Sequence, residues 1–457
     1  MTLIKSISGI RGTIGGSTGE NLTPLDVVKF ASAYGMWLKN RTSGSLKVVV
    51  GRDARMSGAI VQNLVQSSLL SLGIDVVDLG LSTTPTVEVA VPLENANGGI
   101  ILTASHNPKE WNALKLLNEK GEFVSAADGA EILSIAENEA FDFAQVDDLG
   151  SSVKKDYLQI HIDAVLALST VNVDLVKKAN LKVVIDAVNS TGGIYIPALL
   201  SQMGVEVVEL YCEPNGKFPH NPEPLPEHLH DLCSLVKESS SDVGFVVDPD
   251  VDRLAIVSED GTLFGEEYTL VAVADHVLKT QKGDTVSNLS STRALRDVSE
   301  KHGVNYHASA VGEVNVVTKM KEVNSPIGGE GNGGIIYPEL HYGRDSLVGV
   351  ALFLTHLAQS KVTCSELRKQ YTDYYMSKQK IQLTPEIDVD NILAVMAKNY
   401  AMEDVNTIDG VKINFSDEWV HLRKSNTEPI IRVYTESTSP SKANELAQRF
   451  MNEINLI

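Results

Sequence analysis

Three aspartates alternate along one short stretch of the chain, at Asp248, Asp250 and Asp252. In an extended backbone, side chains two residues apart point to the same side, so these carboxylates offer the hard oxygen ligands that Mg²⁺ prefers. A calcium-binding loop is one alternative, because Glu259 stands twelfth from Asp248. However, Arg253 occupies the position where that loop needs glycine, and the flanks are strand-like. A solvated acidic turn fits poorly between two apolar runs, and we therefore predict a metal site.

A second stretch places a serine where a buried strand is expected to end. A short apolar run leads into Ser105 and His106. Pro108 disfavours the helical conformation at the residue before it, so the loop should be constrained. An exposed serine on a stiff turn suits a chemical role, and a plain polar connection is the alternative. A serine hydrolase would carry G-x-S-x-G, but Thr103 and Asn107 occupy its glycine positions.

A glycine-rich stretch contains a formal G-x-G-x-x-G at residues 329–334. A dinucleotide-binding fingerprint has to open a helix, whereas the strand-like residues 335–338 follow here, so that interpretation is rejected. The stretch carries one carboxylate, Glu330, and one amide, Asn332. A flexible backbone with these two groups suits recognition of sugar hydroxyls, and a plain glycine-rich connection is the alternative.

Two further stretches carry basic side chains that could bind an anionic ligand such as a phosphate. Residues 423–429, followed by Arg432, combine guanidinium, ammonium and hydroxyl groups with the backbone donors of a turn. This composition suits a phosphate cradle, with a polar hairpin turn as the alternative. Near the start, Arg11 stands between Gly9 and Gly12, which let a loop approach a ligand closely. A solvated arginine is the alternative there.

The elements that must position these groups repeat along the chain. Residues 48–77, 183–208 and 285–306 each read as a strand, a helix with a glycine stop and a second strand, the pattern of a parallel sheet. Three copies predict three related α/β domains. After residue 383, strand-like runs and a final helix predict a smaller α+β domain. We place the four domains at residues 1–152, 153–257, 258–372 and 373–457.

Composition limits the class of protein. The 457 residues are enough for about three or four domains. A formal net charge of −20 argues against nucleic acid or an anionic membrane as a partner, so an anionic substrate must meet a local basic cleft. Cys212, Cys233 and Cys364 are few, odd in number and lack metal-ligand spacing, which favours a reducing compartment. No apolar run suits a signal peptide or spanning helix, and we expect a cytoplasmic protein.

Taken together, these stretches resemble the α-D-phosphohexomutase family, over essentially the whole chain and in the family's order. Residues 103–108 resemble its phosphoserine loop, residues 248–253 its metal loop, residues 330–334 its sugar-binding loop, and residues 423–429 its phosphate-binding loop. The resemblance implies three related mixed-sheet α/β domains and a smaller C-terminal domain around a central cleft. It also implies an intramolecular phosphotransferase, which is an isomerase.

The sequence departs from the family in two loops. The sugar-binding loop commonly reads Glu-x-Ser-Gly-His, and Asn332 and Gly334 replace its serine and histidine. A Glu-x-Asn form is similar to that of acetylglucosamine-phosphate mutases and archaeal phosphoglucosamine mutases. The phosphate-binding loop commonly reads Arg-Pro-Ser-Gly-Thr-Glu-Pro, and Lys424 and Asn426 replace its proline and glycine. Asparagine tolerates the left-handed conformation, so the sequence is compatible with the same turn. These changes affect the substrate more than the reaction type.

The resemblance implies that Ser105 carries a phosphoryl group and exchanges it with a hexose monophosphate through a hexose 1,6-bisphosphate, which is also an activator. It implies a Mg²⁺ ion held by Ser105, Asp248, Asp250 and Asp252, with Arg253 beside it. It implies proton transfer by Lys115 and Arg11, with His106 as a further candidate. It also implies sugar binding by Glu330 and Asn332, and a grip on the unreactive phosphate by Arg423, Ser425, Asn426, Thr427 and Arg432.

The Asn-bearing loop favours glucosamine 6-phosphate and glucosamine 1-phosphate as the substrates, with phosphomannomutase/phosphoglucomutase activity as the alternative. A catalytically silent binding protein would have lost Ser105 or one of the aspartates, and all four residues are present. A metal phosphatase would share the chemistry but release inorganic phosphate. We expect a monomer or homodimer with a small-molecule hexose phosphate as its partner.

Overall fold

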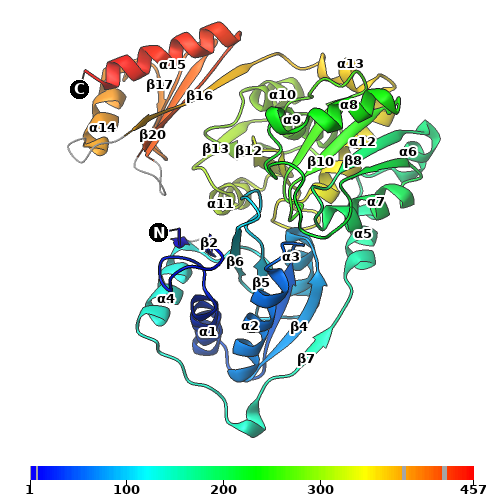
Figure 1. The fold of residues 1–457 in the computed structure, drawn as a ribbon. Coiled ribbons are helices and arrows are strands. Elements are labelled where there is room, and N and C mark those ends of the chain that lie inside the picture. Colours follow the sequence, from blue (N-terminus) through cyan, green and yellow to red (C-terminus); the bar gives the residue numbers. More distant parts are fainter. Residues whose placement is uncertain (1, 7–8, 383–387, 425–429, 457) are drawn as a thin grey trace. The chain divides into compact units, whose positions relative to one another are not determined.

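The structure is a computed structural model that describes residues 2–6, 9–382, 388–424 and 430–456 (Figure 1). The chain divides into two compact units. The first unit comprises Met1–Thr269 and Asn332–Ser365, and the second comprises Leu270–Gly331 and Glu366–Ile457. Helices α9 (Glu266–Val277) and α13 (Cys364–Arg368) span two of the points where the chain passes from one unit to the other. Each unit is described by itself.

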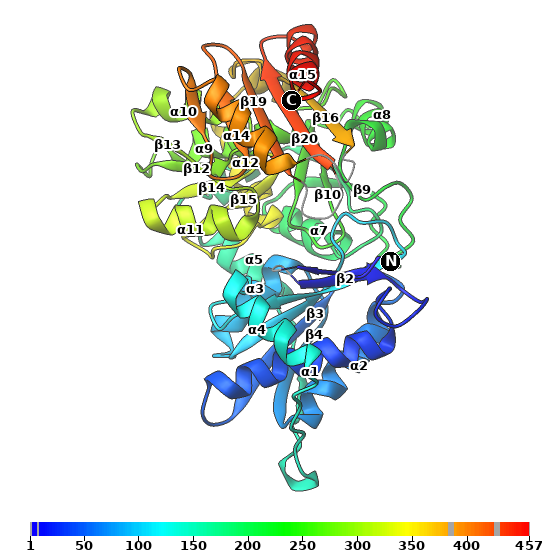
Figure 2. The same ribbon diagram turned by 90° about the vertical axis from the view of Figure 1, so that its left-hand side faces the viewer.

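The first unit begins with a seven-stranded mixed sheet in the order β1-β2-β6-β5-β3-β4-β7. Its strands are β1 (Ile4–Ser6), β2 (Gly9–Thr13), β3 (Leu46–Arg52), β4 (Ile74–Leu81), β5 (Gly98–Leu102), β6 (Trp111–Leu117) and β7 (Ser152–Lys154). Strand β3 is parallel to β4 and β5, whereas β2 and β5 pair antiparallel with β6. The helices of this part are α1 (Pro24–Arg41), α2 (Gly58–Ser71), α3 (Thr84–Leu93) and α4 (Ala126–Glu137), with a 3-10 turn at Val146–Asp148. Helices α1 and α2 lie side by side (Figure 2).

A second, four-stranded sheet in the first unit has the order β11-β10-β8-β9. Its strands are β8 (Lys182–Asp186), β9 (Glu206–Leu210), β10 (Val243–Val247) and β11 (Leu254–Ser258). Only β11 is antiparallel to its neighbour. The surrounding elements are α5 (Leu158–Leu166), α6 (Val173–Ala179), α7 (Gly192–Gln202), a 3-10 turn at Pro226–His228, and α8 (His230–Glu238). The returning chain adds β15 (Gly334–Ile336) and the buried α12 (Ser346–Ser360), which packs against α5 and α6.

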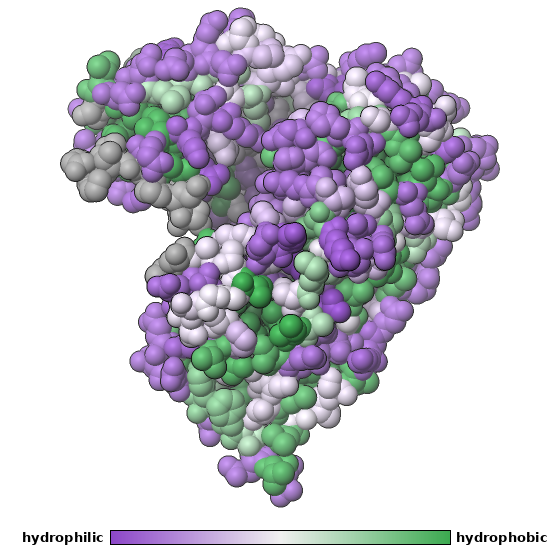
Figure 3. All heavy atoms as spheres, in the orientation of Figure 1, coloured by the Kyte–Doolittle hydropathy of each residue, from purple (hydrophilic) through white to green (hydrophobic). Residues whose placement is uncertain are grey.

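The second unit contains a parallel group, β13-β12-β14, and a five-stranded antiparallel sheet, β16-β20-β19-β18-β17. The first group comprises β12 (Thr285–Asn288), β13 (Tyr306–Ser309), β14 (Ile327–Glu330), α10 (Ala294–His302) and α11 (Glu313–Val323). The sheet comprises β16 (Tyr375–Gln382), β17 (Asp404–Asn406), β18 (Val411–Asn414), β19 (Trp419–Lys424) and β20 (Ile430–Ser437), with α14 (Val389–Asn399) and α15 (Pro440–Ile454). Helix α15 buries apolar residues at helical spacing, including Leu446 and Phe450, and its outer side shows mostly hydrophilic side chains (Figure 3).

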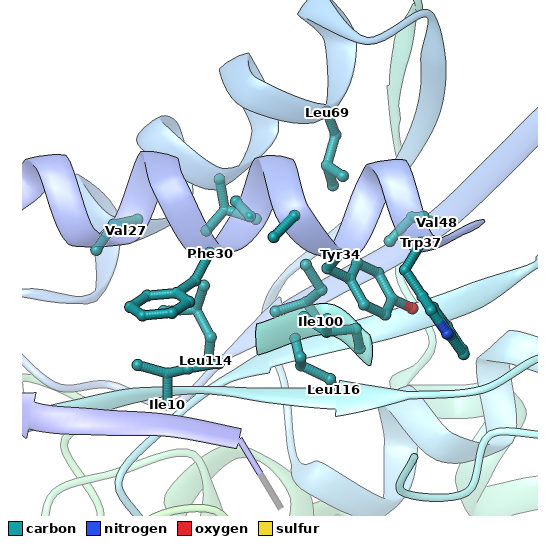
Figure 4. Close-up of a cluster of buried hydrophobic side chains, with 14 of the residues drawn as sticks. Ile10, Val27, Phe30, Tyr34, Trp37, Val48, Leu69, Ile100, Leu114 and Leu116 are labelled. Atoms are coloured by element: carbon teal, nitrogen blue, oxygen red, sulfur yellow. The ribbon is translucent and has the colours of Figure 1, made fainter. Parts of the chain in front are cut away.

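The core of the first sheet shows why its central strands are apolar throughout. Val48 faces the layer of α1, α2 and α4, while Val49 faces the layer of α3. Because successive side chains point to opposite faces, a strand covered on both faces needs apolar residues at every position. From α1, Phe30, Tyr34 and Trp37 point toward the sheet (Figure 4).

The three predicted strand–helix–strand repeats are present, as β3-α2-β4, β8-α7-β9 and β12-α10-β13. One detail of the third repeat differs. The sequence predicts its second strand at residues 304–306, but the strand begins only at Tyr306. The backbone N–H of Val304 instead donates to the Ser299 carbonyl oxygen and closes the end of α10. In the C-terminal part of the chain, strands β16 and β17 and helix α14 are present in addition to the predicted elements. No helix in the described ranges is long and apolar enough to cross a membrane.

Candidate active site

The aspartate loop is a tight turn between β10 and β11. Val251 has a positive φ of 65°, a conformation that a β-branched residue rarely adopts, and its N–H donates to the carbonyl oxygen of Asp248 at 3.1 Å. The N–H groups of Asp252 and Arg253 both donate to Asp248 Oδ1 at 3.1 Å. The turn brings one oxygen from each of the three aspartates, including Asp250, within 4.8 Å of the others.

All three carboxylates are buried. In the described part of the chain, Asp250 Oδ1 and Asp252 Oδ1 are buried without a hydrogen-bond partner. Burial, reinforced by the charges of Asp250 and Asp252, raises the pKa of Asp248 well above its ordinary value. A divalent cation would supply the missing partner of both oxygens and relieve the repulsion between the carboxylates. The residues therefore fit a magnesium ion.

Cations and a hydroxyl hold the remaining oxygens of the same aspartates. Lys115 Nζ, on β6, lies 2.7 Å from Asp250 Oδ2 and 3.3 Å from Asp252 Oδ2. Thr84 Oγ1 donates to Asp250 Oδ2, and an Arg344 guanidinium nitrogen donates to Asp252 Oδ2 at 2.7 Å. Although burial alone would lower it, the charges of the two aspartates raise the pKa of Lys115, which stays protonated.

Ser105 lies directly against the aspartate loop. Its Oγ donates to Asp248 Oδ2 at 2.6 Å, and its backbone is left-handed, with a φ of 50°. The Ser105 N–H donates to Thr103 Oγ1 at 2.8 Å, which fixes this turn, and His106 Nδ1 is 3.4 Å from Ser105 Oγ. The constrained loop at the strand end is thus present. The expected exposed serine is wrong in one respect, because Ser105 is only 7% exposed beneath its neighbours.

A buried arginine shapes the serine loop, and sequence reasoning missed it. The Arg55 guanidinium lies 3.0 Å from Asp53 Oδ2, and both side chains are fully buried. Its other nitrogens donate to four carbonyl oxygens of the serine loop and its continuation, at Ser105, Asn107, Pro108 and Trp111. Asp53 also accepts a hydrogen bond from Thr103 at 2.7 Å. The Asp53–Arg55 pair therefore holds the backbone on both sides of Ser105.

Replacing this arginine is expected to destabilise the fold strongly. Arg55→Ala leaves the buried Asp53 carboxylate without its cation and several carbonyl oxygens without a donor, so the free energy of unfolding should fall by about 3–5 kcal/mol. Urea denaturation followed by circular dichroism measures the change. Arg41→Ala is the control, since the side chain of that arginine is about half exposed and its surface ion pair should contribute about 1 kcal/mol or less. An Arg55→Ala protein as stable as the control would contradict this role.

Three further predicted side chains, those of Arg253, His106 and Arg11, lie near Ser105. Arg253 donates to Glu223 Oε1 at 2.8 Å, and the His106 Nε2 lies 3.9 Å from the other oxygen of Glu223. Burial, followed by the charge of Arg253, lowers the pKa of Arg11 on β2 and lowers that of His106 well below its ordinary value. His106 is therefore neutral near pH 7. Despite the net charge of −20, this place is rich in cations.

The sugar-binding stretch follows β14. Glu330 ends that strand and accepts hydrogen bonds from Asn288 Nδ2 at 2.8 Å and from the Gly312 N–H at 3.3 Å, all within the second unit. Asn332 belongs to the first unit, where its side-chain oxygen accepts from the Gly334 N–H at 3.2 Å. A strand, β15, follows the glycines, as expected, and no helix begins there. Hydrogen bonds thus hold the side chains of Glu330 and Asn332 in defined orientations.

The structure describes only two of the residues predicted to bind the unreactive phosphate. Arg423 on β19 and Arg432 on β20 are direct cross-strand partners in the second unit. Arg423 Nε lies 3.4 Å from Asp409 Oδ2, and Arg432 donates to the Tyr434 hydroxyl at 3.1 Å. The two guanidinium groups therefore come from neighbouring positions of one sheet. The predicted residues Ser425, Asn426 and Thr427 lie outside the described residues.

Sequence reasoning missed several groups that touch the predicted ones. They are Asp53, Arg55, Thr84, Glu223, Asn288 and Arg344. One signal was available for the first two, because Gly51 and Arg52 end the β3 strand and Asp53 follows it, and a charged turn at a strand end can reach the ends of adjacent parallel strands. The others stand far from their partners along the chain, so only the folded structure shows the contact.

Comparison with known proteins gives matches along the whole chain. Four successive segments match the phosphoglucomutase/phosphomannomutase family, as alpha/beta/alpha domain I at residues 3–143, domain II at 159–261, domain III at 265–375 and the C-terminal domain at 379–453. This layout confirms the predicted fold class of three α/β domains and a smaller C-terminal domain.

Individual relatives cover nearly the full length. A phosphoglucomutase/phosphomannomutase of Thermococcus kodakarensis is 36% identical, over 95% of this chain and 96% of the relative. A probable phosphoglucosamine mutase of Methanopyrus kandleri is 32% identical, over 97% of this chain and 96% of the relative. The crystal structure of a phosphoglucomutase/phosphomannomutase family protein from Burkholderia thailandensis matches with a TM-score of 0.85 at 26% identity, covering 99% of this chain and 98% of that one.

Proposed function

The chain belongs to the phosphoglucomutase/phosphomannomutase family and is a phosphohexomutase, and from this we propose that it interconverts glucosamine 6-phosphate and glucosamine 1-phosphate through a phosphoserine at Ser105. One observation carries the mechanism. Ser105 Oγ lies 2.6 Å from a carboxylate of the buried aspartate triad, on a loop that Arg55 holds in place. A phosphoryl group on that oxygen would stand directly beside the metal ligands.

The proposed reaction exchanges one phosphate ester for another. The bond between phosphorus and Ser105 Oγ breaks while a bond from phosphorus to a sugar hydroxyl oxygen forms, giving a hexose 1,6-bisphosphate. The sugar hydroxyl loses its proton to a base, and the departing Ser105 oxygen gains one from an acid. The bisphosphate then returns its other phosphate to Ser105, which restores the phosphorylated enzyme. A trace of hexose 1,6-bisphosphate is the expected activator.

Three side chains are assigned to the proton transfers. The first two candidates are Lys115 and Arg11. Lys115 forms an ion pair with Asp250, and Arg11 lies on β2, the strand that pairs with the Lys115 strand β6. His106, 3.4 Å from Ser105 Oγ, is the third candidate. Arg253 lies beside the triad and would assist by neutralising phosphate charge.

Asp248, Asp250 and Asp252, together with a phosphoserine oxygen, would hold Mg²⁺. When bound, this ion supplies electrostatic stabilisation of the charge on the transferred phosphoryl group. The support is the pair of buried aspartate oxygens that lack a hydrogen-bond partner among the residues described.

Substrate positioning is assigned to the remaining predicted residues. Glu330 and Asn332 would bind the sugar hydroxyls or the group at C2, and a set of donors from the C-terminal domain would grip the phosphate that does not react, namely Arg423, Ser425, Asn426, Thr427 and Arg432. A single grip for either phosphate explains how both orientations of the bisphosphate are bound.

Phosphoglucomutase/phosphomannomutase activity is the second candidate, favoured by the name of the relative at 36% identity. The glucosamine assignment is supported by Asn332 in the sugar-binding loop and by the name of the relative at 32% identity. Replacing one group at C2 changes binding by as little as about 1–3 kcal/mol, so the two activities overlap readily.

A side-by-side assay distinguishes the two substrates. With Mg²⁺ and a trace of hexose 1,6-bisphosphate, kcat/KM should be at least about 10-fold higher for glucosamine phosphate than for glucose or mannose phosphate. In Asn332→Ser, this ratio should fall, because the amide that distinguishes the loop is lost. Preference for glucose or mannose phosphate would transfer the assignment to the second candidate. Release of inorganic phosphate without isomerisation would reject both.

A further inference from the structure

A second group of metal-ligating side chains lies in the first unit, apart from the aspartate triad. It comprises His161 on α5, His341 in the loop before α12, and Asp345 at the N-cap of α12. The Nε2 of His161 is 2.9 Å from Asp345 Oδ2, and the Nε2 of His341 is 3.2 Å from the same oxygen. The three ligand atoms lie within 4.8 Å of one another, and the side chains of His161 and Asp345 are almost fully buried.

The other nitrogen of each imidazole faces a polar group on α3. His161 Nδ1 lies 2.8 Å from the Thr86 hydroxyl, and His341 Nδ1 lies 3.3 Å from Glu88 Oε2, both on α3. The charge of the Glu88 carboxylate favours a proton on the His341 Nδ1 that faces it. Its Nε2 then points at Asp345 and requires either a second proton or a cation. This is the arrangement in which histidine ligands of metals are usually held.

The surrounding loop is built tightly around this group. A Cβ added at Gly343 would stand 1.8 Å from Glu88 Oε2, so only glycine lets the loop approach that carboxylate. Asp345 Oδ1 is already occupied, because it accepts from the N–H groups of Leu347 and Val348 at the start of α12. Its Oδ2 is therefore the one oxygen turned toward both imidazoles.

Charge favours a cation at this place. Glu88 and Asp345 are both buried carboxylates, at 1% exposure each, and buried charges need compensation. Two neutral imidazoles cannot supply it. Two occupants can do so, namely additional protons on the histidines or a divalent ion between them.

We propose that His161, His341 and Asp345 bind one Zn²⁺ ion or a similar divalent transition-metal ion. Two imidazole nitrogens and one carboxylate oxygen suit Zn²⁺, with a water molecule in the fourth position of the tetrahedron. The ion joins α5 to the loop that precedes α12. That loop also carries Arg344, which donates to Asp252 of the aspartate triad. The ion therefore stabilises the segment that places Arg344.

Metal analysis of the intact protein tests the proposal. The protein is stripped with a chelator, incubated with Zn²⁺ at pH 8 in saturating Mg²⁺, desalted and measured by plasma mass spectrometry. The wild type should retain about one zinc per chain and show a Tm higher by a few degrees. His341→Gln should lose most of this zinc. His307→Gln should retain it, because His307 faces a single, partly exposed aspartate, Asp284.

Two other results of the zinc measurement would overturn the proposal, and a second variant covers the case in which His341→Gln does not fold. Equal zinc in the wild type and His341→Gln, or zinc that saturating Mg²⁺ displaces completely, would assign the ion to the aspartate triad and overturn the proposal. Absence of zinc from the wild type would leave protons as the occupants and also overturn it. If His341→Gln does not fold, the same zinc measurement is made on His161→Gln. Loss of the zinc that the wild type retains in saturating Mg²⁺ would then support the proposal, and equal zinc in both proteins would overturn it.

Discussion

Ser105→Ala is expected to lower the turnover of hexose monophosphate by at least about 10³-fold, even with hexose 1,6-bisphosphate supplied. The variant lacks the Oγ that lies 2.6 Å from Asp248, which is the oxygen proposed to carry the phosphoryl group between substrates. Steady-state kinetics measures the loss. Intact mass spectrometry of the same samples should show a phosphorylated fraction in the wild type and none in the variant.

Ser134→Ala is the matched control, because Ser134 lies on the exposed side of α4 and contacts none of the proposed site. It should keep the kcat and the phosphorylation of the wild type. Turnover by Ser105→Ala within about 10-fold of the wild type would reject the phosphoserine mechanism. In that case the family assignment would stand, but another group would have to carry the phosphate.

Asp250→Asn is expected to raise the Mg²⁺ concentration that gives half-maximal activity by more than about 100-fold. Loss of a residue that supports a metal ligand lowers metal affinity by about 10–100-fold, and loss of the ligand itself should cost at least as much. Asp250 offers a buried oxygen that has no hydrogen-bond partner in the described ranges. The substitution also removes the charge that faces Lys115 at 2.7 Å. Activity measured across a Mg²⁺ titration gives the result.

Two comparisons make this test specific. Asp148→Asn changes an exposed aspartate of a 3-10 turn in the same unit, and its Mg²⁺ dependence should match that of the wild type. Asp252→Asn should behave like Asp250→Asn, since Asp252 Oδ1 is also a buried oxygen without a partner in the described chain. An unchanged Mg²⁺ requirement in both triad variants would show that these carboxylates do not hold the ion.

The site could be predicted wherever its residues stand close together in the chain. Asp248, Asp250 and Asp252 share one loop, and the sequence therefore indicates a metal site without knowledge of the fold. Arg344 and Thr84 could not be found in this way. They reach the same aspartates from 92 and 166 residues away, and an isolated arginine or threonine has no local pattern that distinguishes it from a solvated one.

The fold shows a similar limit. The apolar strands β3, β8 and β10 are covered on both faces, which produces continuous apolar runs that are easy to recognise. β16 is an edge strand with mostly exposed or partly exposed residues, so its sequence resembles a polar loop. Its eight residues are ordered by backbone pairing with β20, a long-range interaction that leaves no periodic apolar signal.

The first unit is not a continuous stretch of chain, because it is completed by residues 332–365 after the chain has passed through part of the second unit. During synthesis, Asp252 therefore leaves the ribosome 92 residues before Arg344. At about 5–20 residues per second, this interval lasts roughly 5–18 s. During that interval, Asp252 lacks its hydrogen bond from Arg344, and α5 and α6 lack the helix α12 that packs against them. The order of synthesis thus makes the aspartate loop one of the last parts of its unit to reach its final environment.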